Sequence, residues 1–389
     1  FIMKILYVSH RYHTNQVHIM KGWHDRNVEV MFLAQYEGVS EIHDYVTFCR
    51  MKPSLVTRIL NYYIDKRYNA SLGEGKKTSL FIPNMWHILS LLRKFSPDVV
   101  ILRDYTIYNM MINAACKLLH INKVIMYSQI PLYGYKAHRH LADKLAKRLF
   151  PKVCFTPVLY KGVVRGKTFH STGWFAPSWY VPLVCDISGT MNKNYCSDGY
   201  IHMVDIGKYR DYKNHFFLVD AISKLKDVSK IRLTIIGQLS QDAEREYFRS
   251  LQRYILDRKL QNVIELHSNI PFKEMQSIYS QADVLILPSK NESAGMVILE
   301  AMAQGLCVMS SEECGLAYCL DEYDCGYVFN LNTVEQLVSQ LNEIIKKPYM
   351  VEKYGRKSQD IVHNYFSFSN YYNELEKLIK YNYGYEFEK

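Results

Sequence analysis

The chain has 389 residues, of which 48% are hydrophobic and 22% charged, and this composition excludes a disordered protein. Two domains are expected at this length, because a single hydrophobic core seldom grows beyond about 250–300 residues. The net charge of +10 is uneven, since residues 1–180 hold 25 Lys and Arg against 10 Asp and Glu, whereas the remainder is net negative. A basic first half favours an anionic partner, such as a phosphate-bearing substrate, an anionic membrane face or nucleic acid.

No apolar run approaches the ~20 residues that span a bilayer, and the opening FIMKILYVSH is typical of a buried strand rather than a leader. The nine Cys are scattered singly and lack C-x-x-C spacing, so we predict reduced thiols and neither a disulfide framework nor a zinc site. We therefore expect a cytoplasmic chain, either free or peripheral on the cytoplasmic face of the membrane.

Short Ile- and Val-rich runs alternate with amphipathic stretches, which is typical of βαβ units around parallel sheets. In the first half the pattern predicts strands over 4–9, 28–33, 98–102, 123–128 and 153–156, and helices over 84–95, 107–119 and 138–150. The second half restarts with the strand-like runs IHMVDIG, RLTIIG, NVIELH, DVLILP and CVMS. The predicted fold class is α/β, with two Rossmann-like, doubly wound domains facing a cleft. We place them over 1–180 and 181–365, with a C-terminal helix in 366–389 that can cross back to the first domain.

Two carboxylates stand at the ends of the mostly apolar run NESAGMVILEAMAQG, residues 291–305. Glu292 is predicted to lie in a loop after a buried strand, and Glu300 about five residues into the buried helix that follows. The small residues before that helix leave backbone N–H groups open at its amino terminus, which favours an anion: Ser293, Ala294 and Gly295. Alternatively, each Glu pairs with an Arg or Lys of its own domain and has no function.

A cationic loop, GKYRDYKN at residues 207–214, follows the strand-like run HMVDI. Its cations Lys208, Arg210 and Lys213 can neutralise a diphosphate, although a solvated charged loop explains them equally. In a doubly wound fold this loop and the Glu292 loop lie along one edge of the same sheet.

The pairing of G-K-x-x-x-x-K-N with P-S-x-x-E-S-x-G-x-x-x-L-E-A-M-A-x-G, at 288–305, resembles the retaining glycosyltransferases of family 4, which have the GT-B arrangement. The resemblance extends over about residues 200–330. It implies transfer of a sugar, with retention, from a UDP- or GDP-sugar to a glycan or lipid-diphosphate-linked acceptor, in bacterial surface polysaccharide assembly. It implies neither a metal nor another cofactor. A nucleotide-sugar 2-epimerase and an inactive nucleotide-sugar-binding subunit remain alternatives.

The resemblance also implies roles for individual residues. Glu292 contacts the hydroxyls of the donor sugar and Glu300 those of the ribose, while Lys208 and Lys213 stabilise the departing diphosphate. Lys208 stands where the family usually has Arg, so the charge is kept and the planar fork is lost. The remaining donor contacts are placed at Gly207, Arg210, Ser293, Ala294, Gly295 and Met296. In this interpretation the two carboxylates lack a protein partner because their partner is the ligand.

The first half departs from the family, which commonly has a Gly-rich loop after the first strand and a His after the strand that here ends VIMYSQ. Acceptor contacts are therefore predicted at the ends of the first-half strands: His10, His13, Arg103, Asp104, Ser128 and Gln129. With His10 and His13, His18 is a further substitute for the missing family His.

Two segments, 58–69 and 136–150, combine cations with aromatic or aliphatic residues, which is typical of a peripheral membrane surface. The alternative is a solvated helix face that packs on its own sheet. We expect no nucleic-acid partner, because no RNP-like or other nucleic-acid module is found.

Overall fold

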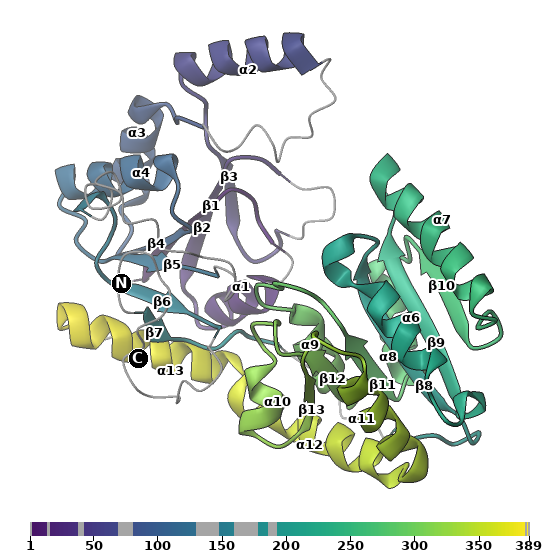
Figure 1. Ribbon diagram of the computed structural model, residues 1–389. Coiled ribbons are helices and arrows are strands. Elements are labelled where there is room, and N and C mark those ends of the chain that lie inside the picture. The colour runs from purple at the N-terminus through teal and green to yellow at the C-terminus, as the bar shows by residue number, and fades with distance from the viewer. Residues whose placement is uncertain are drawn as a thin grey trace.

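A computed structural model of the chain describes residues 2–13, 16–37, 43–68, 81–129, 148–158, 178–185, 193–385 and 387. It contains two parallel sheets, each with its own covering helices (Figure 1). The predicted α/β class with two Rossmann-like domains is thereby confirmed.

The first sheet has seven strands in the order β3-β2-β1-β4-β5-β6-β7. Its strands are β1 (Lys4–Ser9), β2 (Glu29–Ala34), β3 (Thr47–Arg50), β4 (Val99–Arg103), β5 (Val124–Tyr127), β6 (Cys154–Thr156) and β7 (Ser178–Tyr180). Its helices are α1 (Val17–His24), α2 (Leu55–Tyr68), α3 (Met85–Phe95) and α4 (Ile107–Leu118). The sequence pattern missed β3 and β7, the two short edge strands. Most of the helix predicted over 138–150 lies outside the described residues.

The second sheet has six strands in the order β10-β9-β8-β11-β12-β13. Its strands are β8 (Ile201–Lys208), β9 (Ile231–Gln238), β10 (Ile264–Ser268), β11 (Val284–Leu287), β12 (Cys307–Ser311) and β13 (Gly326–Phe329). The helices are α6 (His215–Ser223), α7 (Asp242–Asp257), α8 (Phe272–Gln281), α9 (Met296–Ala303), α10 (Tyr318–Glu322), α11 (Glu335–Lys346) and α12 (Tyr349–Tyr365).

The C-terminal helix α13 (Phe368–Tyr383) crosses back to the first domain, as the yellow ribbon in Figure 1 shows. Its buried face, which includes Leu375 and Ile379, joins the core that contains Ile5. The hydroxyls of Tyr7 and Tyr371 lie 2.9 Å apart inside that core. The last helix of the chain therefore belongs to the hydrophobic core of the first domain.

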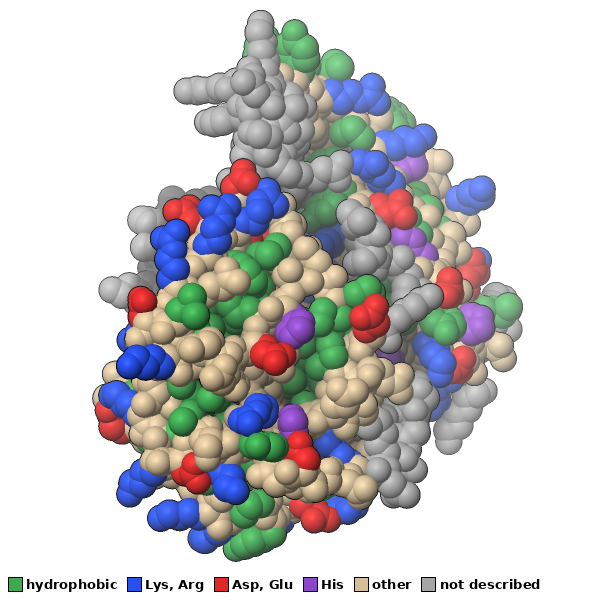
Figure 2. Space-filling view, turned by 90° about the vertical axis from the view of Figure 1, so that its right-hand side faces the viewer, with side chains coloured by type: hydrophobic (Ala, Val, Ile, Leu, Met, Phe, Trp, Pro, Cys, Tyr) green, Lys and Arg blue, Asp and Glu red, His purple; other side chains and the backbone are tan. Residues whose placement is uncertain are grey.

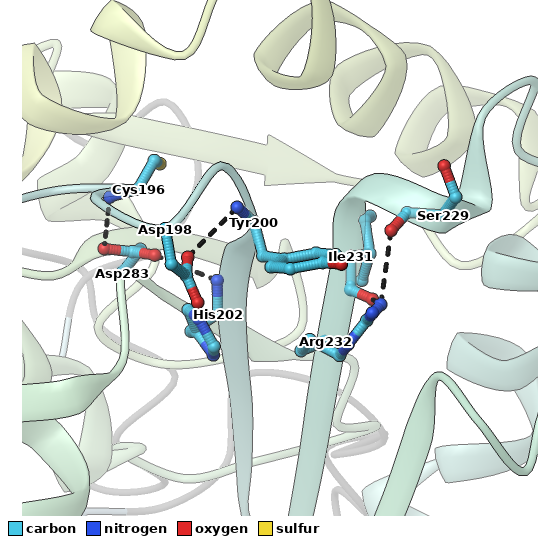
Figure 3. A network of polar contacts seen from close by, with 8 residues as sticks. All are labelled: Cys196, Asp198, Tyr200, His202, Ser229, Ile231, Arg232 and Asp283. Carbon is cyan, nitrogen blue, oxygen red and sulfur yellow. Dashed lines mark hydrogen bonds and ion pairs between the residues drawn. The ribbon is translucent and has the colours of Figure 1, made fainter.

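Polar contacts join the neighbouring strands β8, β9 and β11 at the amino edge of the second sheet (Figure 3). The Asp283 carboxylate, just before β11, accepts hydrogen bonds from the backbone N–H groups of Cys196 and His202 at 3.1 and 2.9 Å. The Arg232 guanidinium of β9 lies 3.9 Å from the centre of the Tyr200 ring. These contacts fix β11 against β8, and thereby position the loops that leave the opposite edge.

Candidate functional site

The chain reverses its direction of strand addition between β8 and β11, which are neighbours in the second sheet. Ligands of open parallel sheets bind outside the carboxyl ends of the strands at such a switch point. The two loops that flank it are 207–214, after β8, and 288–295, after β11. These loops hold the cations and the carboxylates that the sequence indicated. In the first sheet the corresponding switch point lies between β1 and β4.

An ion pair connects the two loops, because Lys213 Nζ lies 2.7 Å from Glu292 Oε2. The exposed fractions of these side chains are 8% and 18%. Burial lowers the pKa of Lys213, but the charge and hydrogen bond of Glu292 more than offset this effect, so the pKa is raised. The expectation that only a ligand would partner Glu292 is therefore wrong, because the other cationic loop supplies a partner.

Close backbone approaches hold the two loops in place. A Cβ at Gly207 would stand 2.8 Å from Cε of Lys213, so glycine leaves the space that this side chain occupies. The backbone N–H of Lys290 donates to the Tyr212 carbonyl at 2.6 Å, which ties the loops together directly. Gly295 takes the left-handed conformation, with φ 72°, at the start of α9, where glycine is favoured. The remaining predicted donor contacts, Ser293, Ala294 and Met296, lie around this residue.

Glu300 lies one turn into α9, and its Oε2 accepts a hydrogen bond of 2.9 Å from the Tyr279 hydroxyl. Burial raises the pKa of Glu300, although the hydrogen bond from Tyr279 lowers it. Its partner within the described residues is thus a neutral hydroxyl rather than a cation. A carboxylate in such surroundings has unused acceptor capacity for hydroxyl groups.

Arg210 differs from the two lysines of its loop. It donates to Glu244 Oε1 at 2.9 Å and to Gln241 Oε1 at 2.8 Å, at the capping box that begins α7. The charge of Arg210 is therefore paired with Glu244 of α7. Its contact with the donor stays a prediction. Lys208 is exposed, and its ammonium group makes no hydrogen bond or ion pair with any described residue. Desolvation by the surrounding loop and repulsion from Arg210 lower its pKa.

A buried acid and base beneath the ion pair were not found from the sequence. Asp205 of β8 and His215 of α6 are both 0% exposed, and Asp205 Oδ2 lies 3.7 Å from His215 Nε2. Among the described residues neither Asp205 oxygen has a hydrogen-bond partner. Burial raises the pKa of Asp205 to about 8, whereas burial and the Lys213 charge lower the pKa of His215 to about 3. The only signal in the sequence was a carboxylate inside the apolar strand IHMVDIG.

The residues predicted on the acceptor side gather at the carboxyl edge of the first sheet. Arg103 Nη2 donates to Gln129 Oε1 at 2.7 Å, and Arg103 Nε lies 3.6 Å from Asp104 Oδ2. His10 and His13 follow β1, with their Nε2 atoms 3.2 Å apart. Ser128 is buried beside Gln129, and its backbone N–H donates to the Phe155 carbonyl. The predicted residues other than His18 thus come from the ends of three neighbouring strands.

Burial and the charges of Arg103 and Arg11 lower the pKa of His10 to about 4, and burial and the Arg103 charge also lower that of His13. Both imidazoles are therefore neutral near pH 7. Arg11 also lowers the pKa of Lys208, so this loop of the first domain lies within electrostatic range of the β8 loop. His18 belongs elsewhere, in a cavity of about 300 Å³ between α1 and the junction of α12 and α13.

Among the described residues no group of three or more His, Cys, Asp and Glu is arranged to hold a metal ion. Lys208, Lys213, Lys290 and the amino terminus of α9 are positive groups that the two loops can offer to an anion, whereas Arg210 is paired with Glu244. In the same described part of the chain, no helix is both long and apolar enough to cross a bilayer.

Comparison with known families identifies the second half of the chain. Residues 191–360, which contain both loops, match the family described as glycosyl transferases group 1. These residues belong to the group 1 glycosyl transferases. The Lys213–Glu292 pair thus lies inside the group 1 glycosyl transferase domain.

Curated relatives match over part of their length. The chain is 31% identical to the D-inositol 3-phosphate glycosyltransferase of Pseudarthrobacter chlorophenolicus over 31% of this chain and 28% of that protein. It is 27% identical to the lipopolysaccharide glucosyltransferase WaaG of Escherichia coli K12 over 33% of this chain and 32% of WaaG. The matches therefore span about a third of the length of these relatives.

Solved structures match over nearly the whole chain. The glycosyltransferase of Rickettsia africae has a TM-score of 0.71 at 14% identity, covering 97% of this chain and 98% of that one. HepE of Anabaena, in complex with UDP and glucose, has a TM-score of 0.69 at 12% identity, covering 97% and 100%. At these identities the likeness shows the fold, which is the GT-B arrangement of two Rossmann-like domains.

Proposed function

We propose that the chain is a hexosyltransferase that moves a sugar, with retention, from a nucleotide-sugar donor to a glycan or lipid-diphosphate-linked acceptor. The observation that carries this proposal is the Lys213–Glu292 pair at the switch point between β8 and β11. A nucleotide sugar presents an anion beside neutral hydroxyls. Lysine and glutamate are complementary to these two parts of the donor.

Donor binding exchanges the partners of this ion pair. The diphosphate takes the place of the Glu292 carboxylate at Lys213, and the released carboxylate accepts hydrogen bonds from the sugar hydroxyls. Both new contacts are charge-assisted, as is the one they replace, so breaking the pair leaves neither charge without a partner. Glu300 accepts hydrogen bonds from the ribose, because its second oxygen is not used by Tyr279.

The same groups stabilise the transition state. As the bond between the anomeric carbon and the diphosphate breaks, negative charge grows on the leaving group, and Lys208, Lys213 and the amino terminus of α9 face it. The amino terminus of α9, and Lys213 once donor binding has taken it from Glu292, are fixed before the chemical step, so they need little reorganisation as the charge develops. The acceptor hydroxyl is placed beside His10, His13 and Arg103, at the facing edge of the first sheet.

A role in bacterial surface polysaccharide assembly is supported by two relatives. One is WaaG, and the other is an uncharacterized 41.2 kDa protein in the cps region of Klebsiella pneumoniae, 26% identical over 38% of this chain. The nine free cysteines fit the reducing cytoplasm, where we place the enzyme.

Release of nucleoside diphosphate from UDP- and GDP-sugars, with and without membrane lipid extract as acceptor, tests the proposal. We expect Glu292→Ala to lower turnover about 10²-fold or more while the protein stays folded, because the sugar loses its anchor. Glu265→Ala, at a carboxylate that is 74% exposed, is the matched control and keeps wild-type turnover. Unchanged turnover in Glu292→Ala contradicts the assignment.

The same assay separates the alternatives. A 2-epimerase converts the donor without a sugar acceptor and without a dependence on Glu292. An inactive binding subunit is stabilised by nucleotides yet releases no diphosphate. A thermal-shift screen of UDP, GDP and their sugars identifies the base, because ligand at 100 times its Kd stabilises the native state by about 2.7 kcal/mol.

A further inference from the structure

The loop after β12, residues 312–317, runs beside the loop that carries Glu292 and is called the β12 loop. Its Cys314 forms a parallel β-bridge with Glu292. The backbone N–H of Glu292 donates to the Glu313 carbonyl at 3.1 Å, and the Gly315 N–H donates to the Glu292 carbonyl at 3.0 Å. Both backbone groups of Glu292 are therefore held by the β12 loop.

The side chain of Glu313 adds a contact one residue earlier. Its Oε2 accepts a hydrogen bond of 2.9 Å from the backbone N–H of Asn291. Asn291 has a left-handed backbone conformation, with φ 49°, which residues other than glycine seldom adopt, although Asn does so more readily than most. The chain thus turns directly before Glu292, and the Glu313 carboxylate holds that turn.

The two loops also approach each other closely at Gly315. A Cβ at this position would overlap the carbonyl oxygen of Ser293, so glycine leaves the space that this carbonyl occupies. At the end of β12 the Ser311 hydroxyl donates to the Ser289 carbonyl at 2.5 Å. These contacts fix the backbone on both sides of Glu292, so a change of partner by this residue is a movement of its side chain.

An acidic side chain on the second domain is not unusual by itself. Figure 2 shows Asp and Glu mixed with Lys and Arg over the side of this domain that faces the viewer. Glu313 differs from such surface carboxylates because its side chain and its carbonyl hold two consecutive N–H groups, those of Asn291 and Glu292. Asn291 is exposed, so the side-chain hydrogen bond competes with water and adds little to stability. Its effect is on the position of the turn.

The proposed exchange of partners makes this position matter. Glu292 Oε2 lies 2.7 Å from Lys213 Nζ, and after the exchange the same carboxylate has to meet the hydroxyls of a sugar. A side chain that rotates about a fixed backbone reaches one part of the sugar. Displacement of the turn by about 1 Å would misplace both carboxylate oxygens, and errors of this size are costly where reacting groups are positioned.

We propose that Glu313 is a positioning residue for the donor sugar, because its carboxylate holds the turn at Asn291 and thereby places Glu292 against the sugar hydroxyls. The inference rests on the proposed function, in which Glu292 binds the sugar. It gives Glu313 no contact with the sugar itself.

Calorimetric titration separates binding of the sugar from binding of the nucleotide. Wild type, Glu313→Ala and Glu313→Gln are titrated with UDP and UDP-glucose, and with GDP and GDP-mannose. We expect Glu313→Ala to lose about fivefold in affinity for the nucleotide sugar relative to the diphosphate, because a displaced Glu292 contacts the sugar less well. Affinity for the diphosphate should not fall, because Lys208 and Lys213 lie on the loop after β8.

The conservative variant and a control show what the loss depends on. Glu313→Gln keeps an oxygen that accepts from the Asn291 N–H, so its affinity for the nucleotide sugar should return to within about twofold of wild type. Glu265→Ala, at a carboxylate that is 74% exposed, should keep wild-type affinities. A Glu313→Gln variant as weak as Glu313→Ala overturns the proposal. So does a Glu313→Ala variant that loses the diphosphate and its sugar equally, because the role is then only structural.

A double-mutant cycle shows whether Glu313 acts through Glu292. In the Glu292→Ala background, Glu313→Ala should cause no further loss, because the side chain that it positions is absent. A loss that persists in this background overturns the proposal. If Glu292→Ala weakens sugar binding and Glu313→Ala does not, the positioning role alone is wrong. If Glu292→Ala itself binds the nucleotide sugar like wild type, the proposed function fails, and the positioning role fails with it.

Discussion

The carboxyl edges of the two sheets hold charge in different ways. On the second sheet Lys213 and Glu292 are 2.7 Å apart, and each can exchange the other for a ligand. On the first sheet Arg103 is 7% exposed, and its closest partner is the neutral amide of Gln129. This difference fits the proposal that the second edge receives a ligand with an anionic and a hydroxyl part. The first edge is a fixed arrangement in which buried Arg103 contacts Gln129 and Asp104 beside neutral imidazoles.

Removal of a cation from the second edge is expected to have the largest effect. Lys213→Ala leaves Glu292 without its partner and the leaving diphosphate without a fixed charge. We expect turnover to fall by about 10²–10³-fold, as when one preorganised donor is removed from a transition-state site. Steady-state release of nucleoside diphosphate measures the effect. The control Lys347→Ala, at a lysine that is 52% exposed, keeps its activity. If Lys213→Ala keeps it too, exchange at the second edge is not part of the reaction.

Asp205→Asn tests the buried acid beneath the second edge. The pKa of Asp205 is raised to about 8 in the folded protein from 3.8, so the native state holds a proton that the unfolded chain has lost. Its contribution to stability is complete below pH 4 and is lost as the pH rises through 8. Asp205→Asn should therefore gain stability relative to wild type by about 3 kcal/mol between pH 6 and 8. Urea unfolding at pH 6, 7 and 8 measures this gain. A difference that is constant with pH places the proton elsewhere.

His10→Gln tests the first edge, where the stability contribution of the titrating group changes with pH in the opposite direction. Because the pKa of His10 is lowered to about 4, its contribution to stability is present above pH 6.5 and is lost as the pH falls through 4. Wild type should thus lose up to about 2 kcal/mol relative to His10→Gln between pH 6.5 and 5. The same urea titrations serve as the readout. A parallel decline of both proteins shows that folding does not lower the pKa of His10.

Tyr279→Phe is expected to have the smallest effect. It removes one hydrogen bond to Glu300 and leaves the ring in place, so the free energy of unfolding should fall by about 1 kcal/mol. Nucleotide affinity should change less than tenfold, because Glu300 keeps its carboxylate. Calorimetric titration with UDP or GDP checks this. A larger loss of affinity indicates that Tyr279 itself contacts the ligand.

The sequence predicted the two sheets and the position of the loops 207–214 and 288–295. Buried parallel strands are continuous apolar runs, Gly207 lies near the end of β8, and Gly295 marks the turn into α9, so these features are local in the sequence. The edge strands β3, β7 and β13 were missed because they have only three or four residues and little periodicity.

Contacts between side chains that are far apart in the sequence could not be predicted from it. Lys213 and Glu292 are 79 residues apart, and their contact depends on how the loops after β8 and β11 close on each other. Arg210 and Lys208 are two residues apart and equally cationic, yet only Arg210 is held by the capping box of α7. Asp205 and His215 meet because the strand and the helix that carry them pack together, and no local motif reports this contact.

The exchange of partners at the second edge is tested most directly by calorimetric titration of wild type and Glu292→Gln with UDP and UDP-glucose, and with GDP and GDP-mannose. We expect Glu292→Gln to bind the free nucleoside diphosphate as tightly as wild type or more tightly, because Lys213 no longer has a competing carboxylate. For the nucleotide sugar, in contrast, it should lose at least tenfold in affinity relative to the diphosphate. Equal changes in affinity for the diphosphate and its sugar, or no change in either, contradict the account.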